Sequence, residues 1–134
     1  MTYKSLAKRA QAARKHSHSP YSQFRVGAAL LSKTGKVFTG CNIEISTFAL
    51  TICAERTAIF KAISEGSSRF KAIAIATDES GFTPPCGACR QVLMDLAGNI
   101  DVLITNRRGV IRQYTLEELF PLPFGADNLK RNRK

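Results

Sequence analysis

The chain has 134 residues, of which 44% are hydrophobic and 22% charged, and its net charge is +10. This length and composition are typical of one globular domain that buries a core without disulfide staples, and no segment approaches the roughly 18 apolar residues of a membrane span. The polar, basic start does not resemble a secretory signal peptide, so we expect a cytoplasmic protein, in which closely spaced cysteines more often bind metal or act in catalysis than form disulfides.

Hydrophobic periodicity divides the chain into alternating helices and strands. In chain order we expect a helix at 3–15, strands at 24–32 and 37–40, a loop at 41–52, a helix at 53–66, a strand at 71–77, a helix at 86–98, strands at 101–105 and 110–114, and a short helix at 115–120. The apolar run 71–77 fits a central strand that is covered on both faces. This order predicts an α/β fold, a three-layer α/β/α sandwich around a five-stranded sheet. We expect one domain over residues 1–126 and a basic, flexible tail over 127–134.

Two cysteine motifs stand at the starts of two expected helices, C-A-E at 53–55 and P-C-G-A-C at 85–89. The C-x-x-C spacing of Cys86 and Cys89 on a first helical turn lets both sulfurs approach one zinc ion at about 2.3 Å. That spacing alone also fits a redox dithiol. Cys53 adds a third thiolate, and three protein ligands leave zinc the open fourth position of a catalytic site. We therefore expect Cys53, Cys86 and Cys89 to bind one catalytic Zn²⁺.

Two charged residues follow Cys53 on the same helical turn. Zinc makes a bound water acidic near neutral pH, and Glu55 beside that water can carry its proton without being a ligand. Three thiolates leave the site one negative charge in excess, which we expect Arg56 and the two helix N-termini to offset. Taken singly, Cys53 also fits a core cysteine, Glu55 an acid at a helix N-terminus and Arg56 a surface residue. Their combination with P-C-x-x-C favours the metal site.

Three further potential ligands stand outside these motifs, Cys41, His16 and His18. We expect Cys41 to be a buried free thiol and both histidines to lie at the surface or to cap a helix. If Cys41 or His16 were instead a fourth ligand, the zinc site would be structural.

The spacing C-A-E…P-C-x-x-C matches the three-cysteine form of the zinc-deaminase signature. Five longer segments narrow the resemblance: SPYSQFRVGAALL (19–31), GCNIE (40–44), TICAERTAIFKAISEG (51–66), PCGACRQVL (85–93) and LEELFPLPFG (116–125). Over nearly its whole length the chain resembles cytidine deaminase of the small homotetrameric, zinc-dependent type. The resemblance implies a mixed sheet, one Zn²⁺ per subunit and a homotetramer. It also implies the hydrolytic deamination of cytidine and 2′-deoxycytidine to uridine and 2′-deoxyuridine, with release of ammonia, in pyrimidine salvage.

The resemblance further implies which residues hold the substrate. The implied contacts are Phe24 with the pyrimidine ring, Asn42 and Glu44 with the ribose hydroxyls, the Ala54 backbone together with Glu55 at the polar edge of the base, and Phe124 reaching in from a neighbouring subunit. Phe24 and Phe124 also fit ordinary core positions. Two positions depart from the family pattern: Ile45 stands where an Asn is expected, and Phe48 where a Tyr is common. Both changes remove possible hydrogen bonds on the sugar side, each contributing about 0.5–1.5 kcal/mol.

Three other functions fit parts of the sequence. The same scaffold could deaminate a related aminonucleoside such as blasticidin S, for which Ile45 leaves room. The zinc could be purely structural. The positive charge could bind nucleic acid, but it gathers at the ends, with five basic residues in 1–16 and four in 127–134, and only Tyr3 there offers an aromatic ring for base stacking. A polynucleotide editor also usually has His as its first ligand, where this chain has Cys53. We therefore expect a small nucleoside as the partner and no membrane.

Overall fold

A computed structural model describes residues 1–129, which form one five-stranded mixed sheet with helices on both faces. The strands are β1 (Val26–Ser32), β2 (Val37–Cys41), β3 (Phe70–Thr77), β4 (Asp101–Thr105) and β5 (Ile111–Thr115). Their order across the sheet is β2-β1-β3-β4-β5. Strands β3 and β4 are parallel and every other neighbouring pair is antiparallel. The predicted five-stranded mixed sheet is confirmed.

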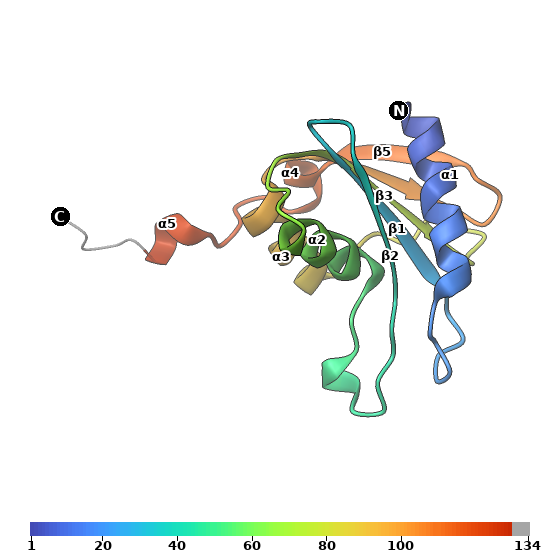
Figure 1. The fold of residues 1–134 in the computed structure, drawn as a ribbon. Helices are drawn as coiled ribbons and strands as arrows, with labels where there is room; N and C mark the ends of the chain where they lie inside the picture. Colours follow the sequence, from blue (N-terminus) through green and yellow to red (C-terminus); the bar gives the residue numbers. More distant parts are fainter. Residues whose placement is uncertain (130–134) are drawn as a thin grey trace.

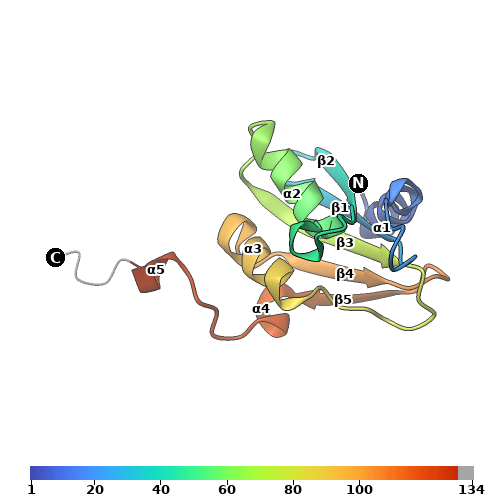
Figure 2. The same ribbon diagram turned by 90° about the horizontal axis from the view of Figure 1, so that it is seen from below.

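The helices cover this sheet unequally. They are α1 (Tyr3–Ala13), α2 (Ala54–Ser64), α3 (Gly87–Ala97), α4 (Leu116–Leu119) and α5 (Ala126–Leu129), with 3₁₀ turns η1 (Arg14–His16) and η2 (Phe48–Leu50). Figure 1 shows α1 on one side of the sheet and α2, α3 and α4 on the other, while α5 projects away from the sandwich in Figures 1 and 2. Among residues 1–129, no helix combines the length and apolar character needed to cross a bilayer.

The two layers of core follow from the alternation of side chains along the central strand β3. Ala72, Ala74 and Ala76 face α1 in one buried cluster. Ile73 and Ile75 face α2 and α3 in the other. The small alanine side chains let α1 lie close to the sheet, whereas the larger isoleucines fill the wider space under two helices. The expectation of a central strand buried on both faces is confirmed.

Three boundaries differ from the expectation in ways that matter for function. Strand β1 begins at Val26 and not at residue 24, so Phe24 lies in the preceding loop, after Gln23 in the left-handed region at φ 58°. Helices α2 and α3 begin one residue later than expected, so that Cys53 and Cys86 are their N-caps. Residues 127–129 belong to the short helix α5, which was not expected. The rest of the predicted tail, 130–134, lies outside the described residues, so the domain boundary stays a prediction.

Candidate active site

Three cysteine sulfurs converge where α2 and α3 begin, near the carboxyl end of the central strand β3. The Sγ atoms of Cys53, Cys86 and Cys89 all lie within 4.8 Å of one another, and those of Cys86 and Cys89 are 3.4 Å apart. Tetrahedral zinc with sulfur ligands at 2.3 Å requires sulfur–sulfur spacings of about 3.8 Å. Neither N-cap cysteine uses its side chain to cap its helix. The cluster is thus positioned to hold a metal ion, and the donor set fits zinc.

The pKa values of two of these sulfurs move in opposite directions. The pKa of Cys53 is lowered to about 5, first by the hydrogen bond from Cys89 and then by Arg56, whose Nη2 lies 3.3 Å from the Cys53 Sγ. The pKa of Cys89 moves the other way and is raised, first by its hydrogen bond to Cys53. In the metal-free chain one thiolate therefore forms at the expense of its neighbour. Cysteine binds a metal as the thiolate, so metal binding at this cluster would release protons.

Glu55 lies beside the cluster without joining it. It occupies the first turn of α2, its exposed fraction is 4%, and it is not part of the three-cysteine group. Burial raises the pKa of Glu55 to about 7 in the metal-free chain. A carboxyl group placed beside a reacting water can both accept and return a proton during a reaction.

A cavity of about 230 Å³ opens in front of these residues. It brings together six of the predicted site residues: Phe24, Asn42, Cys53, Ala54, Glu55 and Cys86. It is completed by six residues that sequence reasoning missed: Val26, Thr51, Ile75, Thr77, Thr83 and Pro84. The sequence could have indicated two of these residues, because Thr77 ends the central strand and Pro84 immediately precedes the P-C-x-x-C motif. Ends of sheet strands are where α/β proteins place their ligands.

Asn42 is less available to a ligand than its predicted role suggests. Its buried Oδ1 accepts hydrogen bonds from Ser17 Oγ at 2.5 Å and from the Val26 N–H at 3.0 Å. Its Nδ2 donates to the Phe24 carbonyl at 2.7 Å. Both oxygen lone pairs are thus occupied, and one amide hydrogen remains for a substrate. Asn42 therefore also fixes the backbone of Phe24, whose ring lines the cavity.

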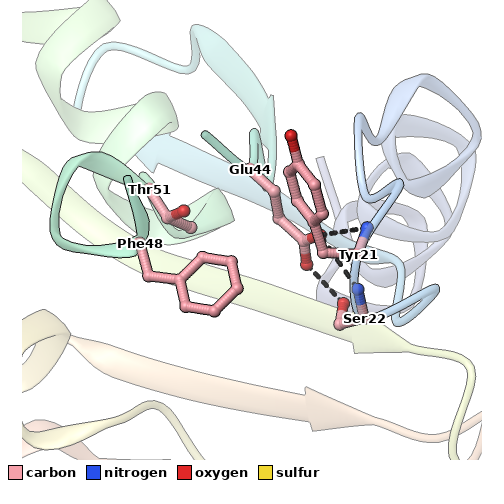
Figure 3. A pocket seen from close by; sticks show the side chains of 5 residues that line it. All are labelled: Tyr21, Ser22, Glu44, Phe48 and Thr51. Carbon is pink, nitrogen blue, oxygen red and sulfur yellow. Dashed lines mark hydrogen bonds between the residues drawn. The ribbon is translucent and has the colours of Figure 1, made fainter. Parts of the chain in front are cut away.

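Glu44 lines a second cavity of about 340 Å³, which adjoins the first because Thr51 lines both. Figure 3 shows its carboxylate turned toward the loop that carries Tyr21 and Ser22. The Glu44 Oε1 accepts from the backbone N–H groups of Tyr21 at 3.0 Å and Ser22 at 3.1 Å, and Oε2 accepts from the Ser22 hydroxyl. These hydrogen bonds, that of the Ser22 side chain first, lower the pKa of Glu44. The group is an ionised acceptor at neutral pH.

Ile45 and Phe48, which depart from the family pattern, lie beside this second cavity. Phe48 lines it with 71% of its surface exposed and makes an edge-on contact with Tyr21, the ring centroids 5.8 Å apart. Ile45 is also exposed, and its backbone N–H donates to Thr51 Oγ1 at 3.0 Å. At these two positions the chain carries apolar surface in place of the amide and the hydroxyl of the family pattern.

The remaining predicted residues lie elsewhere. Phe124 is 56% exposed near Asp95, outside both cavities of this chain, so its contact with a neighbouring subunit stays a prediction. Cys41 and His16 line a separate cavity of about 190 Å³. Cys41 is a free thiol as expected, but it is partly and not fully buried, while His16 and His18 are exposed. Within residues 1–129, no fourth Cys, His, Asp or Glu joins the sulfur cluster, which leaves the structural-zinc alternative without support.

Comparisons with known proteins agree with this geometry. The family model "Cytidine and deoxycytidylate deaminase zinc-binding region" matches residues 1–104. A cytidine deaminase of Sporosarcina psychrophila is 45% identical over 130 residues, covering 96% of both chains. The crystal structure of cytidine deaminase from Burkholderia pseudomallei has a TM-score of 0.90 and 44% identity, covering 92% of this chain and 100% of that one. A blasticidin-S deaminase of Bacillus cereus is 35% identical, covering 77% of this chain and 79% of that protein. The chain belongs to the zinc-dependent cytidine and deoxycytidylate deaminase family.

Proposed function

We propose that this protein deaminates cytidine and 2′-deoxycytidine by hydrolysis to uridine and 2′-deoxyuridine, releasing ammonia, as an enzyme of pyrimidine salvage. The observation that carries the proposal is a buried carboxyl group, Glu55, in the same cavity as a three-cysteine cluster fit for zinc. Zinc bound to three thiolates would make a water acidic near neutral pH and stabilise negative charge developing on oxygen. The 45% identity to a cytidine deaminase along 96% of the chain gives independent support.

The chain's own residues have distinct roles in this proposal. Glu55 accepts a proton from the attacking water, delivers it to N3 of the base, and later helps to protonate the leaving amine. The Ala54 backbone, at the first position of α2, reads the polar edge of the base together with Glu55. Phe24 lies against the pyrimidine ring. Arg56 offsets the excess negative charge through its hydrogen bond to Cys53.

Two groups bind the sugar in this proposal, and they differ in what they can offer. Glu44 is ionised and retains accepting capacity, so it takes a hydrogen bond from a ribose hydroxyl. Asn42 can offer one remaining amide hydrogen, since its other polar positions are occupied. The base and the sugar therefore occupy adjoining cavities, with Thr51 between them.

The test is the ultraviolet absorbance of cytidine followed with purified protein, with and without a strong zinc chelator. We expect turnover that the chelator abolishes and added zinc restores. Glu55→Gln should retain one zinc per chain, measured by elemental analysis, and lose about a hundredfold or more in kcat. Glu65→Gln, at the exposed C-terminal cap of the same helix, is the matched control and should leave turnover unchanged. A Glu55→Gln variant within a few-fold of the wild type would refute the proton-carrying role.

A second candidate substrate is blasticidin S, favoured by the 35% identity to a blasticidin-S deaminase and by the apolar Ile45 and Phe48 on the sugar side. Turnover on cytidine and on blasticidin S under the same conditions separates the two. We also propose a cytoplasmic homotetramer in which Phe124 completes a neighbour's pocket. Light scattering on the purified protein tests the tetramer, and loss of turnover without loss of zinc in Phe124→Ala tests the contribution of that residue.

A further inference from the structure

We propose that Ser22 is a positioning residue that couples Glu44, on the sugar side of the pocket, to Phe24, on the base side. The inference rests on the proposed function, because it assumes that Glu44 meets a sugar hydroxyl and Phe24 the pyrimidine. It adds a residue that does not touch the substrate itself and that acts through Glu44 and Phe24.

The hydroxyl of Ser22 stands between the two groups that it connects. It donates its only hydrogen to the Glu44 Oε2, the interaction drawn in Figure 3. The same oxygen accepts the backbone N–H of Phe24 at 3.0 Å. A hydroxyl that donates to an ionised carboxylate becomes a better acceptor, so the two hydrogen bonds strengthen each other. Ser22 thus forms a continuous path from the carboxylate to the backbone of the aromatic residue.

The carboxylate of Glu44 has little freedom left. An ionised carboxylate offers about four lone-pair positions, and the N–H groups of Tyr21 and Ser22 occupy those of Oε1. The Ser22 hydroxyl takes one position on Oε2. A sugar hydroxyl must therefore donate to the remaining position of Oε2, the oxygen whose orientation Ser22 sets.

Phe24 depends on side chains for its position because no regular structure holds it. Strand β1 begins only at Val26, and Gln23 lies in the left-handed region at φ 58°. The Phe24 N–H is held by Ser22, and its carbonyl by Asn42 at 2.7 Å. Removing the Ser22 hydroxyl would free one of these two attachments and also release Oε2 of Glu44.

The test compares two substrates on the same enzyme sample: cytidine, and 2′,3′-dideoxycytidine, which lacks the sugar hydroxyls that Glu44 would accept. The measured quantity is the ratio of their kcat/KM values. This ratio does not depend on the fraction of enzyme that is folded or loaded with zinc. A purely structural defect therefore lowers both values equally and leaves the ratio unchanged.

We expect Ser22→Ala to lower kcat/KM for the dideoxy substrate, because Phe24 loses an attachment, and to lower it further for cytidine. The ratio should fall roughly two- to tenfold, the range for one hydrogen bond. Ser22→Thr, which keeps the hydroxyl, should restore the ratio. Ser46→Ala removes an exposed hydroxyl from the loop that follows Glu44 and should change neither value. In Glu44→Gln, adding Ser22→Ala should have no further effect on the ratio.

An unchanged ratio in Ser22→Ala overturns the proposal. So does an additive effect of the two substitutions, because Ser22 would then act independently of Glu44. A dideoxy substrate that Ser22→Ala turns over as fast as the wild type also overturns it, because the connection to Phe24 would be absent. If the wild-type protein turns over neither substrate, the proposed function itself has failed, which is a distinct result from an unchanged ratio.

Discussion

Gly40 in β2 is a place where helix α2 leaves no room for a side chain. A Cβ at this position would meet the Ala54 carbonyl oxygen at 2.6 Å, the Ala58 nitrogen at 2.6 Å and the Thr57 Cβ at 3.0 Å. Ordinary van der Waals contact begins at 3.4 Å, so the shortfall against the two backbone atoms is 3.4 − 2.6, or 0.8 Å. Backbone of a packed helix cannot rotate out of the way, so Gly40→Ala must displace the start of α2.

The displacement has a cost in stability and a larger one in catalysis. Overpacking a well-filled site costs about 1–3 kcal/mol, and we expect the upper part of this range because the opposing atoms are backbone. The first turn of α2 carries Glu55 and follows Cys53 at the N-cap position, whereas Cys86 is the N-cap residue of α3 and Cys89 lies in its first turn. The shift therefore moves the proposed proton carrier and one of the three cysteines relative to the other two. A misplacement of this size costs about a hundredfold in rate.

Urea unfolding, zinc content and kcat for cytidine measure the three consequences in the same preparations. Gly81→Ala is the matched control, because its Cβ would meet nothing within 4 Å and its φ is not in the left-handed region. The reasoning would be refuted by a Gly40→Ala protein that keeps the stability and the kcat of the Gly81→Ala control.

Two further predictions concern charge. Arg56→Ala removes the donor that lies 3.3 Å from the Cys53 Sγ and leaves the thiolate charge uncompensated. Zinc affinity at neutral pH, measured in competition with a chelating dye, should therefore fall about ten- to hundredfold. An affinity equal to that of the wild type would contradict this prediction. The Arg25 guanidinium donates to the Asp78 carboxylate at 3.0 and 3.1 Å and lowers the pKa of Asp78 below its ordinary value of 3.8. The stabilisation from this pair is therefore present above pH 3.8 and is lost as the pH falls through the pKa of Asp78 in the folded state. Asp78→Asn should thus lower the free energy of unfolding at neutral pH, with a difference in urea unfolding that disappears in acid; a difference that persists there would contradict the assignment.

The metal centre could be predicted from sequence because its parts are local in the chain. Cys86 and Cys89 share one helical turn, and Glu55 follows Cys53 by two positions, so ligand type and spacing are sufficient to suggest the chemistry. The predicted order of strands and helices held for a related reason, since hydrophobic periodicity is also a local property. Only the meeting of Cys53 with the other two sulfurs needed the fold or the resemblance.

The second cavity, where we propose that the sugar binds, could not be predicted in the same way, because its hydrogen bonds join distant segments. Ser22 and Glu44 are 22 positions apart, and neither the residue types nor their spacing indicates that they form a hydrogen bond. Phe24 continued an apolar run and was assigned to the strand, but side-chain hydrogen bonds hold it in a loop before β1. Asn42 was predicted as a sugar ligand, yet most of its hydrogen-bonding capacity serves the protein backbone. A polar residue in a binding loop can hold the protein backbone and also bind a ligand, and the sequence does not show how many of its hydrogen bonds serve each role.

The two kinds of site also differ in what binding would do to the chain. The three cysteines join the starts of α2 and α3, two helices on one face of the sheet that otherwise meet through apolar packing. Because zinc affinity for a site that exists only in the folded chain adds to folding stability, the metal would act as a cross-link as well as a catalyst. The second cavity has no such cross-link: Glu44 and the loop around Ser22 are held by hydrogen bonds at an exposed surface. Substitutions of the cysteines themselves should therefore alter stability, zinc content and rate together, whereas substitutions around Glu44 should change substrate preference while zinc content stays the same.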